Sequence, residues 1–173
     1  MRHTAPAVSA PGRALMSEHE PAVVARPLRH GDVRTVIGIF NRLSERSRRL
    51  RFNGPKLCLS RAELRRLATV DADRQALVAY VEDNPSPVGI ARFVRNGASA
   101  EIAFAVVDEY QRRGIGSALV SELVADARAA GIGELTALVS AGNVAALALL
   151  RRVANTLTVR YEGTELSVRA AIS

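Results

Sequence analysis

The 173-residue sequence has one cysteine, no tryptophan and only three histidines. A single cysteine, Cys58, cannot form an internal disulfide, so the sequence excludes a fold held by disulfides. The histidines, His3, His19 and His30, are scattered and form no ligand cluster with Cys58, so we expect no metal site. Because no histidine stands near Cys58 in the sequence, we expect it to be a small buried apolar residue rather than a nucleophile.

Long apolar runs are also missing, and none approaches the roughly 20 residues that a membrane-spanning helix needs. Residues 1–21 are rich in proline, alanine and serine and lack the apolar centre of a secretory signal. We predict that they form a disordered arm, with Met16 as an alternative start of translation. Residues 22–173 then form one domain, and a reducing, cytoplasmic location is expected.

Lysine is nearly missing although the net charge is +7, since Lys56 is the one lysine among 24 lysine and arginine residues. Arginine makes planar, bidentate contacts with phosphate and carboxylate, so the basic surface could meet nucleic acid, an acidic protein or a phosphorylated cofactor. Three tyrosines and four phenylalanines leave little for base stacking, which argues against nucleic acid. A simply solvated basic surface is the remaining alternative.

The apolar periodicity predicts an α/β (α+β) domain. Caps and helical spacing predict helices that begin after Asp32, Ser60, Gly114 and Asn143. The expected strands are three consecutive runs between residues 75 and 107, one run at 134–140 and a final pair turning at Glu162-Gly163. The order is therefore helix, helix, antiparallel meander, helix, strand, helix and hairpin.

The segment QRRGIGSALV, residues 111–120, places two glycines between a predicted strand and a helix. Free N–H groups and the positive end of the helix dipole at such a point can hold a pyrophosphate. A Walker loop is excluded, because it needs a lysine before serine or threonine. A dinucleotide fingerprint fits poorly, because Leu119 stands where a third small residue is required and Glu134 begins the next strand instead of ending it.

The pattern Gln111-x-x-Gly114-x-Gly116 after an antiparallel strand resembles the acyl-CoA-binding signature of the GNAT superfamily of N-acetyltransferases. The element order is similar over residues 23–171. Within the superfamily, LSERSRRLRF and AEIAFAVVDEYQRRGIG resemble the acetyltransferase domain of bacterial Pat-type protein lysine acetyltransferases. The resemblance implies a GNAT fold, in which a mixed, mostly antiparallel sheet is flanked by about four helices, in a monomer or homodimer. Such proteins often carry a regulatory domain, for which residues 1–21 are too few.

The resemblance implies transfer of an acetyl group from acetyl-CoA to an amine, with a protein lysine favoured. The implied cofactor-binding residues are Phe104, Val106, Val107, Gln111, Arg112, Arg113, Gly114, Ile115, Gly116, Ser117 and Asn143. Backbone N–H groups of the loop would hold the pyrophosphate. The strand would pair with the pantetheine arm, and a backbone N–H at Val106 or Val107 would polarise the thioester carbonyl.

Glu101 is the candidate general base. The reaction needs one, because a lysine amine with a pKa near 10.4 is protonated at neutral pH. On an unbroken strand Glu101 shares a face with Ala103 and Ala105, whose small side chains leave room beside it. This fits acetyltransferases that keep a glutamate at this point of the strand. A merely solvated glutamate is the alternative.

A general acid is harder to find. Many relatives place a tyrosine in the helix after the asparagine, where this chain has Leu149 and Leu150. Tyr110 and Tyr161 are the remaining phenols nearby, and each is expected to be structural, which leaves water as the acid or no acid at all. Three functions therefore stay open: a protein lysine acetyltransferase, an acetyltransferase for small-molecule or N-terminal amines, and a catalytically weak acyl-CoA-binding module.

Five arginines follow the first predicted helix, at positions 42, 46, 48, 49 and 51. As a segment they are expected to line the acceptor entrance and to attract an acidic protein surface. Each side chain taken alone is equally compatible with a solvated basic face.

Overall fold

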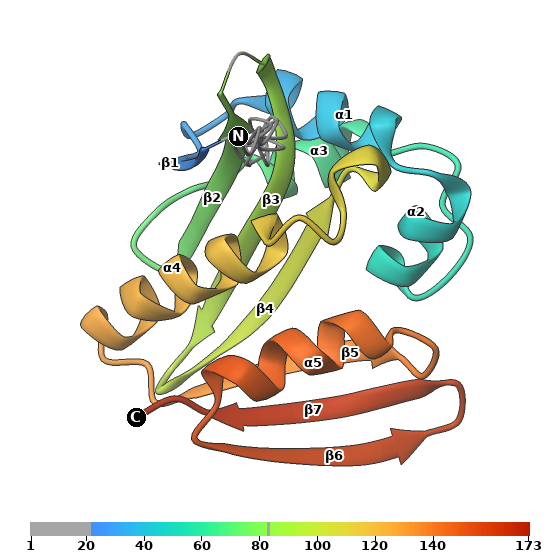
Figure 1. The fold of residues 1–173 in the computed structure, drawn as a ribbon. Helices are drawn as coiled ribbons and strands as arrows, with labels where there is room; N and C mark the ends of the chain where they lie inside the picture. Colours follow the sequence, from blue (N-terminus) through green and yellow to red (C-terminus); the bar gives the residue numbers. More distant parts are fainter. Residues whose placement is uncertain (1–21, 83) are drawn as a thin grey trace, which may run out of the picture.

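The computed structural model describes residues 22–82 and 84–173, which form a seven-stranded sheet with helices on both faces (Figure 1). The strands are β1 (Val23–Pro27), β2 (Arg74–Val81), β3 (Asn84–Asn96), β4 (Ser99–Val106), β5 (Glu134–Ser140), β6 (Thr156–Glu162) and β7 (Glu165–Ala171). The helices are α1 (Val33–Arg42), α2 (Glu45–Phe52), α3 (Arg61–Leu67), α4 (Ile115–Ala129) and α5 (Val144–Val153), with a 3-10 turn, η1 (Asp108–Tyr110). The predicted arm at residues 1–21 lies outside the described residues.

The strand order is β1-β2-β3-β4-β5-β7-β6. Neighbouring strands in the described part are antiparallel except β4 and β5, which confirms the mixed, mostly antiparallel sheet. The β2–β3–β4 meander and the β6–β7 hairpin also form as predicted. Within these residues no helix is both long enough and apolar enough to cross a membrane.

Two elements differ from the sequence-based expectation. β1 is an additional strand, which pairs with β2 along one edge of the sheet. The basic segment after α1 forms a separate helix, α2, so that the described part holds five α-helices instead of about four. No residue of α2 is fully buried. An apolar stripe is the signal that reveals a helix in a sequence, and α2 has none.

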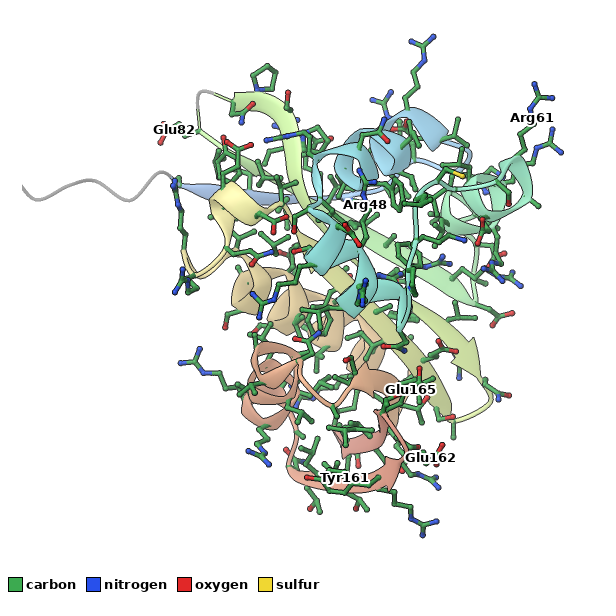
Figure 2. All side chains as sticks on the ribbon, turned by 90° about the vertical axis from the view of Figure 1, so that its right-hand side faces the viewer. Arg48, Arg61, Glu82, Tyr161, Glu162 and Glu165 are labelled. Carbon is green, nitrogen blue, oxygen red and sulfur yellow. The ribbon has the colours of Figure 1, made fainter. Side chains whose placement is uncertain are left out.

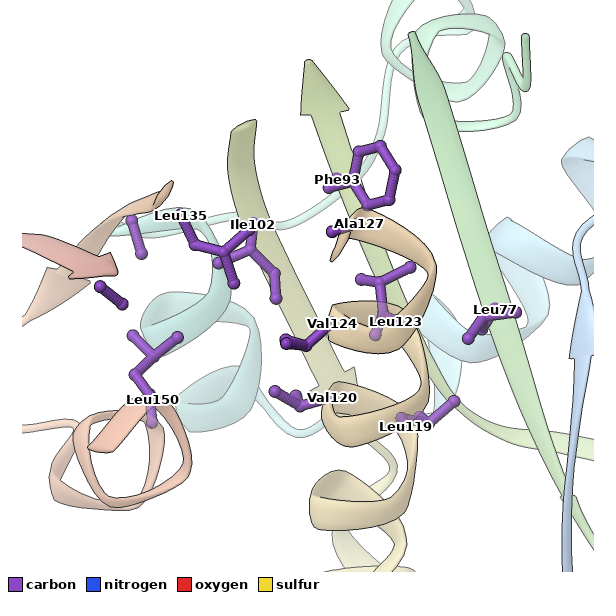
Figure 3. Packing of buried hydrophobic residues seen from close by; sticks show 14 of the residues in the cluster. Leu77, Phe93, Ile102, Leu119, Val120, Leu123, Val124, Ala127, Leu135 and Leu150 are labelled. Carbon is purple, nitrogen blue, oxygen red and sulfur yellow. The ribbon is translucent and has the colours of Figure 1, made fainter. Parts of the chain in front are cut away.

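The core on one face of the sheet is built around α4 (Figure 3). The predicted apolar stripe is confirmed, since Ile115, Leu119, Val120, Leu123, Val124 and Ala127 are all buried. They pack with residues from the sheet and from α5, such as Ile102, Leu135 and Leu150. Gly131, with φ of 76°, follows the end of α4, where a left-handed residue commonly stops a helix.

The opposite face of β2 and β3 is covered by α1 and α3. Val36, Ile39 and Phe40 of α1 pack there with Ala76 and Val78 of β2. Since successive strand residues point to opposite faces, each strand sends alternate side chains to α4 and to the α1–α3 side. On β4, Ala100 and Ile102 belong to the α4 cluster, so Glu101 points to the other side of the sheet.

Cys58 lies in the connection between α2 and α3 and is exposed. The expectation of a buried cysteine is therefore wrong. The adjacent Leu59 takes the buried position, in the cluster formed by α1 and α3. Burying the larger leucine removes more apolar surface from water than burying the thiol would.

Candidate active site

The sheet opens between β4 and β5, and this opening positions the candidate site. The two strands pair only from Ser99 to Glu101 against Glu134 to Thr136, and beyond that point they diverge (Figure 1). A cleft of about 900 Å³ occupies the opening. Residues of α2 line the cleft together with residues of α5, so it passes between the strands from one face of the sheet to the other.

Most residues predicted from the sequence come together here. The cleft is lined by Glu101, Phe104, Val106, Gln111, Arg112, Gly114, Gly116, Ser117 and Asn143. Three other predicted positions do not line it. Val107 is buried and its N–H donates to the Val88 carbonyl at 2.9 Å; the Ile115 side chain is in the core; and the Arg113 guanidinium lies 5.4 Å from the centroid of the Tyr110 ring.

The N-terminus of α4 leaves backbone donors free at one end of the cleft. Gly114 is the N-cap with φ of 79°, a left-handed conformation that favours glycine, and no side chain caps the helix. The carbonyl of Gly114 accepts from the N–H of Ala118. The N–H groups of Ile115, Gly116 and Ser117 therefore have no helical acceptor, and they suit an anion such as pyrophosphate. Arg112, at a positive φ of 59°, lines the same end.

Gln111, the first residue of the signature, fastens the loop to its surroundings. Its Nε2 donates to the carbonyl of Val106 at 2.9 Å and to Oγ of Ser47 at 3.1 Å. The end of β4, the glycine loop and α2 are thereby tied together. The glutamine therefore stabilises the position of the glycine loop relative to β4 and α2.

Asn143 is the N-cap of α5, and its Oδ1 accepts from the N–H of Ala146 at 3.1 Å. This is the helix-opening asparagine that the sequence predicted. Asn143 also lines the cleft. The capping bond orients the side chain, so the amide is held in place at the cleft wall.

α2 spans the cleft and is fastened at both ends. At its start, the Asp108 carboxylate accepts from the Ser44 N–H at 2.8 Å, from Ser44 Oγ at 2.6 Å and from Ser47 Oγ at 2.8 Å. At its end, Nδ2 of Asn53 donates to the Leu138 carbonyl of β5 at 3.0 Å. This role of Asp108 was not predicted from the sequence, because its partners lie about 60 residues upstream.

We expect Asp108→Asn to lower the free energy of unfolding by about 1 kcal/mol at pH 7, the usual net worth of such hydrogen bonds at the surface. Burial raises the pKa of Asp108, but the hydrogen bonds from Ser44 and Ser47 outweigh it and hold that pKa below its ordinary value of 3.8. A lowered folded-state pKa means that the contribution is complete above 3.8 and is lost as pH falls through the lower folded value. Urea unfolding should therefore show a gap between wild type and variant at pH 7 that closes in strong acid.

Glu122→Gln is the matched control, since Glu122 is exposed on α4 and its side chain makes no hydrogen bond to any other described residue. It removes the same charge and should leave the unfolding curve unchanged. A gap between wild type and Asp108→Asn that stays constant down to strong acid would show that the carboxylate bonds to α2 are not its cause.

Glu101 stands where the strands part, as the last residue of β4 that pairs with β5. It is exposed to the cleft, and its side chain forms no hydrogen bond or ion pair with any other residue that the structure describes. Ala103 and Ala105, on the same face, also line the cleft. Its carboxylate is therefore free to take part in proton transfer next to a narrow, apolar wall.

Two of the five clustered arginines have structural roles away from the cleft. Arg42 donates to the carbonyl of Pro87 at 2.9 Å. Arg48 donates to the carbonyls of Phe40 and Asn41, both at 3.1 Å, and Figure 2 shows it near the middle of the view. Arg42 therefore ties the end of α1 to β3, and Arg48 braces the turn between α1 and α2.

The remaining three arginines of this segment divide between surface and cleft. Arg49 forms an exposed ion pair with Glu45 at 3.3 Å. Arg46 and Arg51 line the cleft. Burial, followed by the charge of Arg92 on β3, lowers the pKa of Arg51 to about 10, while the charge of Glu101 acts in the opposite direction. Of the five arginines that are neighbours in the sequence, Arg46 and Arg51 are therefore the two that line the cleft.

Neither tyrosine considered as a general acid reaches the cleft. Tyr161 is 80% exposed on β6, near Glu162 and Glu165 at the far end of the C-terminal hairpin (Figure 2). Tyr110 accepts a hydrogen bond on its hydroxyl from Asn84 at 2.8 Å and packs against the core. Among the described residues no phenol lines the cleft, and Leu149 occupies the wall that α5 contributes.

Comparison with known proteins identifies the family. A model of the Acetyltransferase (GNAT) family matches residues 43–154. Acetyltransferase Pat from Mycolicibacterium smegmatis is 38% identical over 133 residues, 74% of this chain and 39% of that protein. Acetyltransferase PA5475 from Pseudomonas aeruginosa is 33% identical over 126 residues, 70% of this chain and 68% of that protein.

The fold agrees with this assignment. The crystal structure of the GNAT domain of S. lividans PAT superimposes with a TM-score of 0.77 at 26% sequence identity, covering 89% of this chain and 98% of that one. The match to the mycobacterial Pat spans only 39% of that relative's length, so this chain is similar to one part of it. The family match covers more than half of the chain and includes the glycine loop at the head of the cleft. The chain belongs to the acetyltransferase (GNAT) family.

Proposed function

We propose that this protein transfers an acetyl group from acetyl-CoA to an amine, with a protein lysine as the acceptor and Glu101 as the general base. One observation carries the proposal: a single cleft joins the free N–H groups of α4 to an unpaired carboxylate at the strand opening. Along β4, Glu101 and Val106 are five residues apart, or about 16 Å at the usual rise of a strand. The reactive end of an extended donor would lie along this stretch, and its phosphate end would reach the free N–H groups of α4 beyond Val106.

The residues at the head of the cleft fit acetyl-CoA, which supplies an acyl carbon activated as a thioester. The N–H groups of Ile115, Gly116 and Ser117 would hold the pyrophosphate, and Arg112 would add positive charge. Past Glu101, β4 has no partner on its β5 side among the described strands. On that side its backbone between Phe104 and Val106 could pair with an extended amide chain, as an added strand would, except at the Val106 carbonyl, which accepts from Gln111.

Glu101 would accept a proton from the attacking amine, directly or through one water, and leave the amine neutral and nucleophilic. The proton that the leaving sulfur requires would come from water, because no phenol of the described part lines the cleft. Two observations favour a protein lysine as acceptor. The chain is 38% identical to Acetyltransferase Pat, in line with the resemblance of its sequence to Pat-type protein lysine acetyltransferases, and α2 offers arginines to an acidic protein surface.

A second candidate function is an acyl-CoA-binding module with weak catalysis. The observation that favours it is the apolar Leu149 on the α5 wall, where a proton donor would aid the leaving thiolate. A third, an acetyltransferase for small or N-terminal amines, has the same cofactor site and differs only in the acceptor.

The test combines calorimetry of acetyl-CoA binding with an assay of thiol release. We expect saturable binding, and thiol release that depends on a mixture of lysine peptides and exceeds the release with free polyamines. Binding without release on any amine would favour the binding module, whereas release with polyamines alone would favour the small-amine enzyme. Absence of binding would contradict the role of the glycine loop.

A further inference from the structure

Arg92 is a charged residue in an unusual place, near the middle of β3. It is only 8% exposed, and its Nε has neither solvent contact nor a hydrogen-bond partner in the part of the chain that the structure describes. No carboxylate there lies within ion-pair distance of it. Burying an unpaired cation is costly, so such a residue calls for a counter-charge.

The sheet register places Arg92 beside the candidate base. Arg92 pairs with Ala103 on β4, which lies two residues after Glu101 on the same face of the sheet. Arg51 of α2 reaches this region from the cleft, whose wall it forms together with Glu101. Burial lowers the pKa of Arg92 most, and the positive charges of Arg66 and Arg74 lower it further. The negative charge of Glu101 raises the pKa of Arg92, as it raises that of Arg51. The two guanidinium groups and the carboxylate therefore share one electrostatic environment.

Positive charge is in excess around Glu101. Arg74 is neutralised by Asp71, with 2.6 Å between Nη1 and Oδ2. Arg51, Arg66 and Arg92 have no ion pair with any described residue, and Glu101 is the one carboxylate acting on Arg51 and Arg92. The surplus lies at the Glu101 end of β4, whereas the free N–H groups of α4 lie past its other end. A phosphate bound at α4 would thus not supply the missing negative charge.

We propose that Arg51, supported by the buried charge of Arg92, forms a carboxylate-binding subsite beside Glu101 that selects acceptors with a carboxylate on, or directly beside, the lysine whose amine reacts. This rests on the proposed acetyl transfer. Arg51 lines the cleft and makes the contact, since a guanidinium binds a carboxylate through two parallel hydrogen bonds. Arg92 does not line the cleft and acts through its charge. A low local dielectric strengthens both contributions.

The test compares acceptors that differ only in that carboxylate. One pair consists of capped lysine peptides with aspartate or asparagine beside the lysine. The other pair is Nα-acetyl-lysine and its methylamide, in which the carboxylate belongs to the small molecule itself. We expect kcat/KM to be at least about tenfold higher for the charged member of a pair, as for a charge-assisted hydrogen bond. In Arg51→Gln this ratio should fall close to one.

Arg49→Gln is the matched control, because Arg49 lies on the same helix, carries the same charge and does not line the cleft. It should keep both the activity and the charge preference. A preference confined to the peptide pair identifies a neighbouring acidic side chain as the source of the carboxylate, and a preference confined to the other pair identifies a small-molecule acceptor. Equal kcat/KM within both pairs, with turnover present, overturns the subsite and leaves acetyl transfer standing.

A binding measurement keeps the subsite testable if no amine is turned over, a result that would defeat the proposed function itself. Peptides with norleucine in place of lysine are titrated into the protein in the presence of CoA. We expect the aspartate peptide to bind at least about tenfold more tightly than the asparagine peptide, and Arg51→Gln to remove the difference. Equal affinities would overturn the proposal. Arg92→Gln should reduce the same ratio, provided that its melting curve shows a folded protein.

Discussion

Glu101→Gln is expected to lower kcat for a lysine peptide by about 10²- to 10⁴-fold at pH 7, the usual contribution of a general base. Acetyl-CoA affinity should stay within about twofold, because interactions made only during the chemical step do not contribute to ground-state binding. Glutamine keeps the shape of the side chain at the strand opening and removes only its ability to accept the proton. Rapid thiol detection gives kcat, and calorimetry gives the dissociation constant of acetyl-CoA.

The pH dependence of kcat distinguishes the loss of a general base in Glu101→Gln from a change in the shape of the site. As pH approaches the amine's own pKa, near 10.4, the amine loses its proton without help. The gap between wild type and Glu101→Gln should therefore narrow toward alkaline pH. Glu162→Gln, at the exposed end of β6 and outside the cleft, is the control and should match wild type throughout. A gap that is constant with pH, or full activity at pH 7, would remove Glu101 from proton transfer.

Most of the fold could be predicted because its signals are local. The stripe of α4, the caps at Asp32 and Ser60 and the alternation of the meander each involve neighbouring residues, and each predicted element formed. The sequence did not predict α2, because half of its eight residues are arginine and none is fully buried, so it shows no apolar period. Its helical state depends instead on the Ser44 cap and on Asp108, which is remote in the sequence.

Some residues of the candidate site could likewise be predicted from local sequence patterns, and others could not. The glycine loop and Glu101 carry a sequence pattern, and the structure brings both to one cleft. Arg92 could not be assigned from the sequence, because its importance depends on the register of β3 with β4 and on the approach of α2. Which arginines after α1 line the cleft also depends on tertiary structure. Arg48 donates to backbone carbonyls, whereas Arg51 lines the cleft. The one sign of Arg92 in the sequence is that it stands alone as a charged residue between apolar residues of a predicted strand.

Gly116→Val is expected to weaken acetyl-CoA binding by about 10²-fold, because hydrogen bonds to a charged group contribute roughly 1.5–3 kcal/mol each and at least one would be lost. A Cβ at position 116 would lie 3.2 Å from Cδ1 of Leu149 and 3.6 Å from Cγ2 of Val106. The first turn of α4 must then shift away from α5, or Leu149 must move into the cleft. The first response displaces the free N–H groups from the position where they would meet the pyrophosphate, and the second places an apolar side chain in the cleft beside them.

Ala118→Val provides the comparison within the same turn of α4, since Ala118 is exposed and does not line the cleft. It introduces the same β-branched side chain at an exposed helical position, where it costs at least as much helix propensity as Gly116→Val does, so acetyl-CoA affinity should change little if the contact with Leu149 is what matters. Calorimetry on both variants, with melting curves to confirm folding, distinguishes the explanations. Equal weakening in the two would mean that helix stability controls binding. Retained affinity in Gly116→Val would mean that the phosphates bind elsewhere, because a site formed by these N–H groups cannot tolerate a side chain between α4 and Leu149.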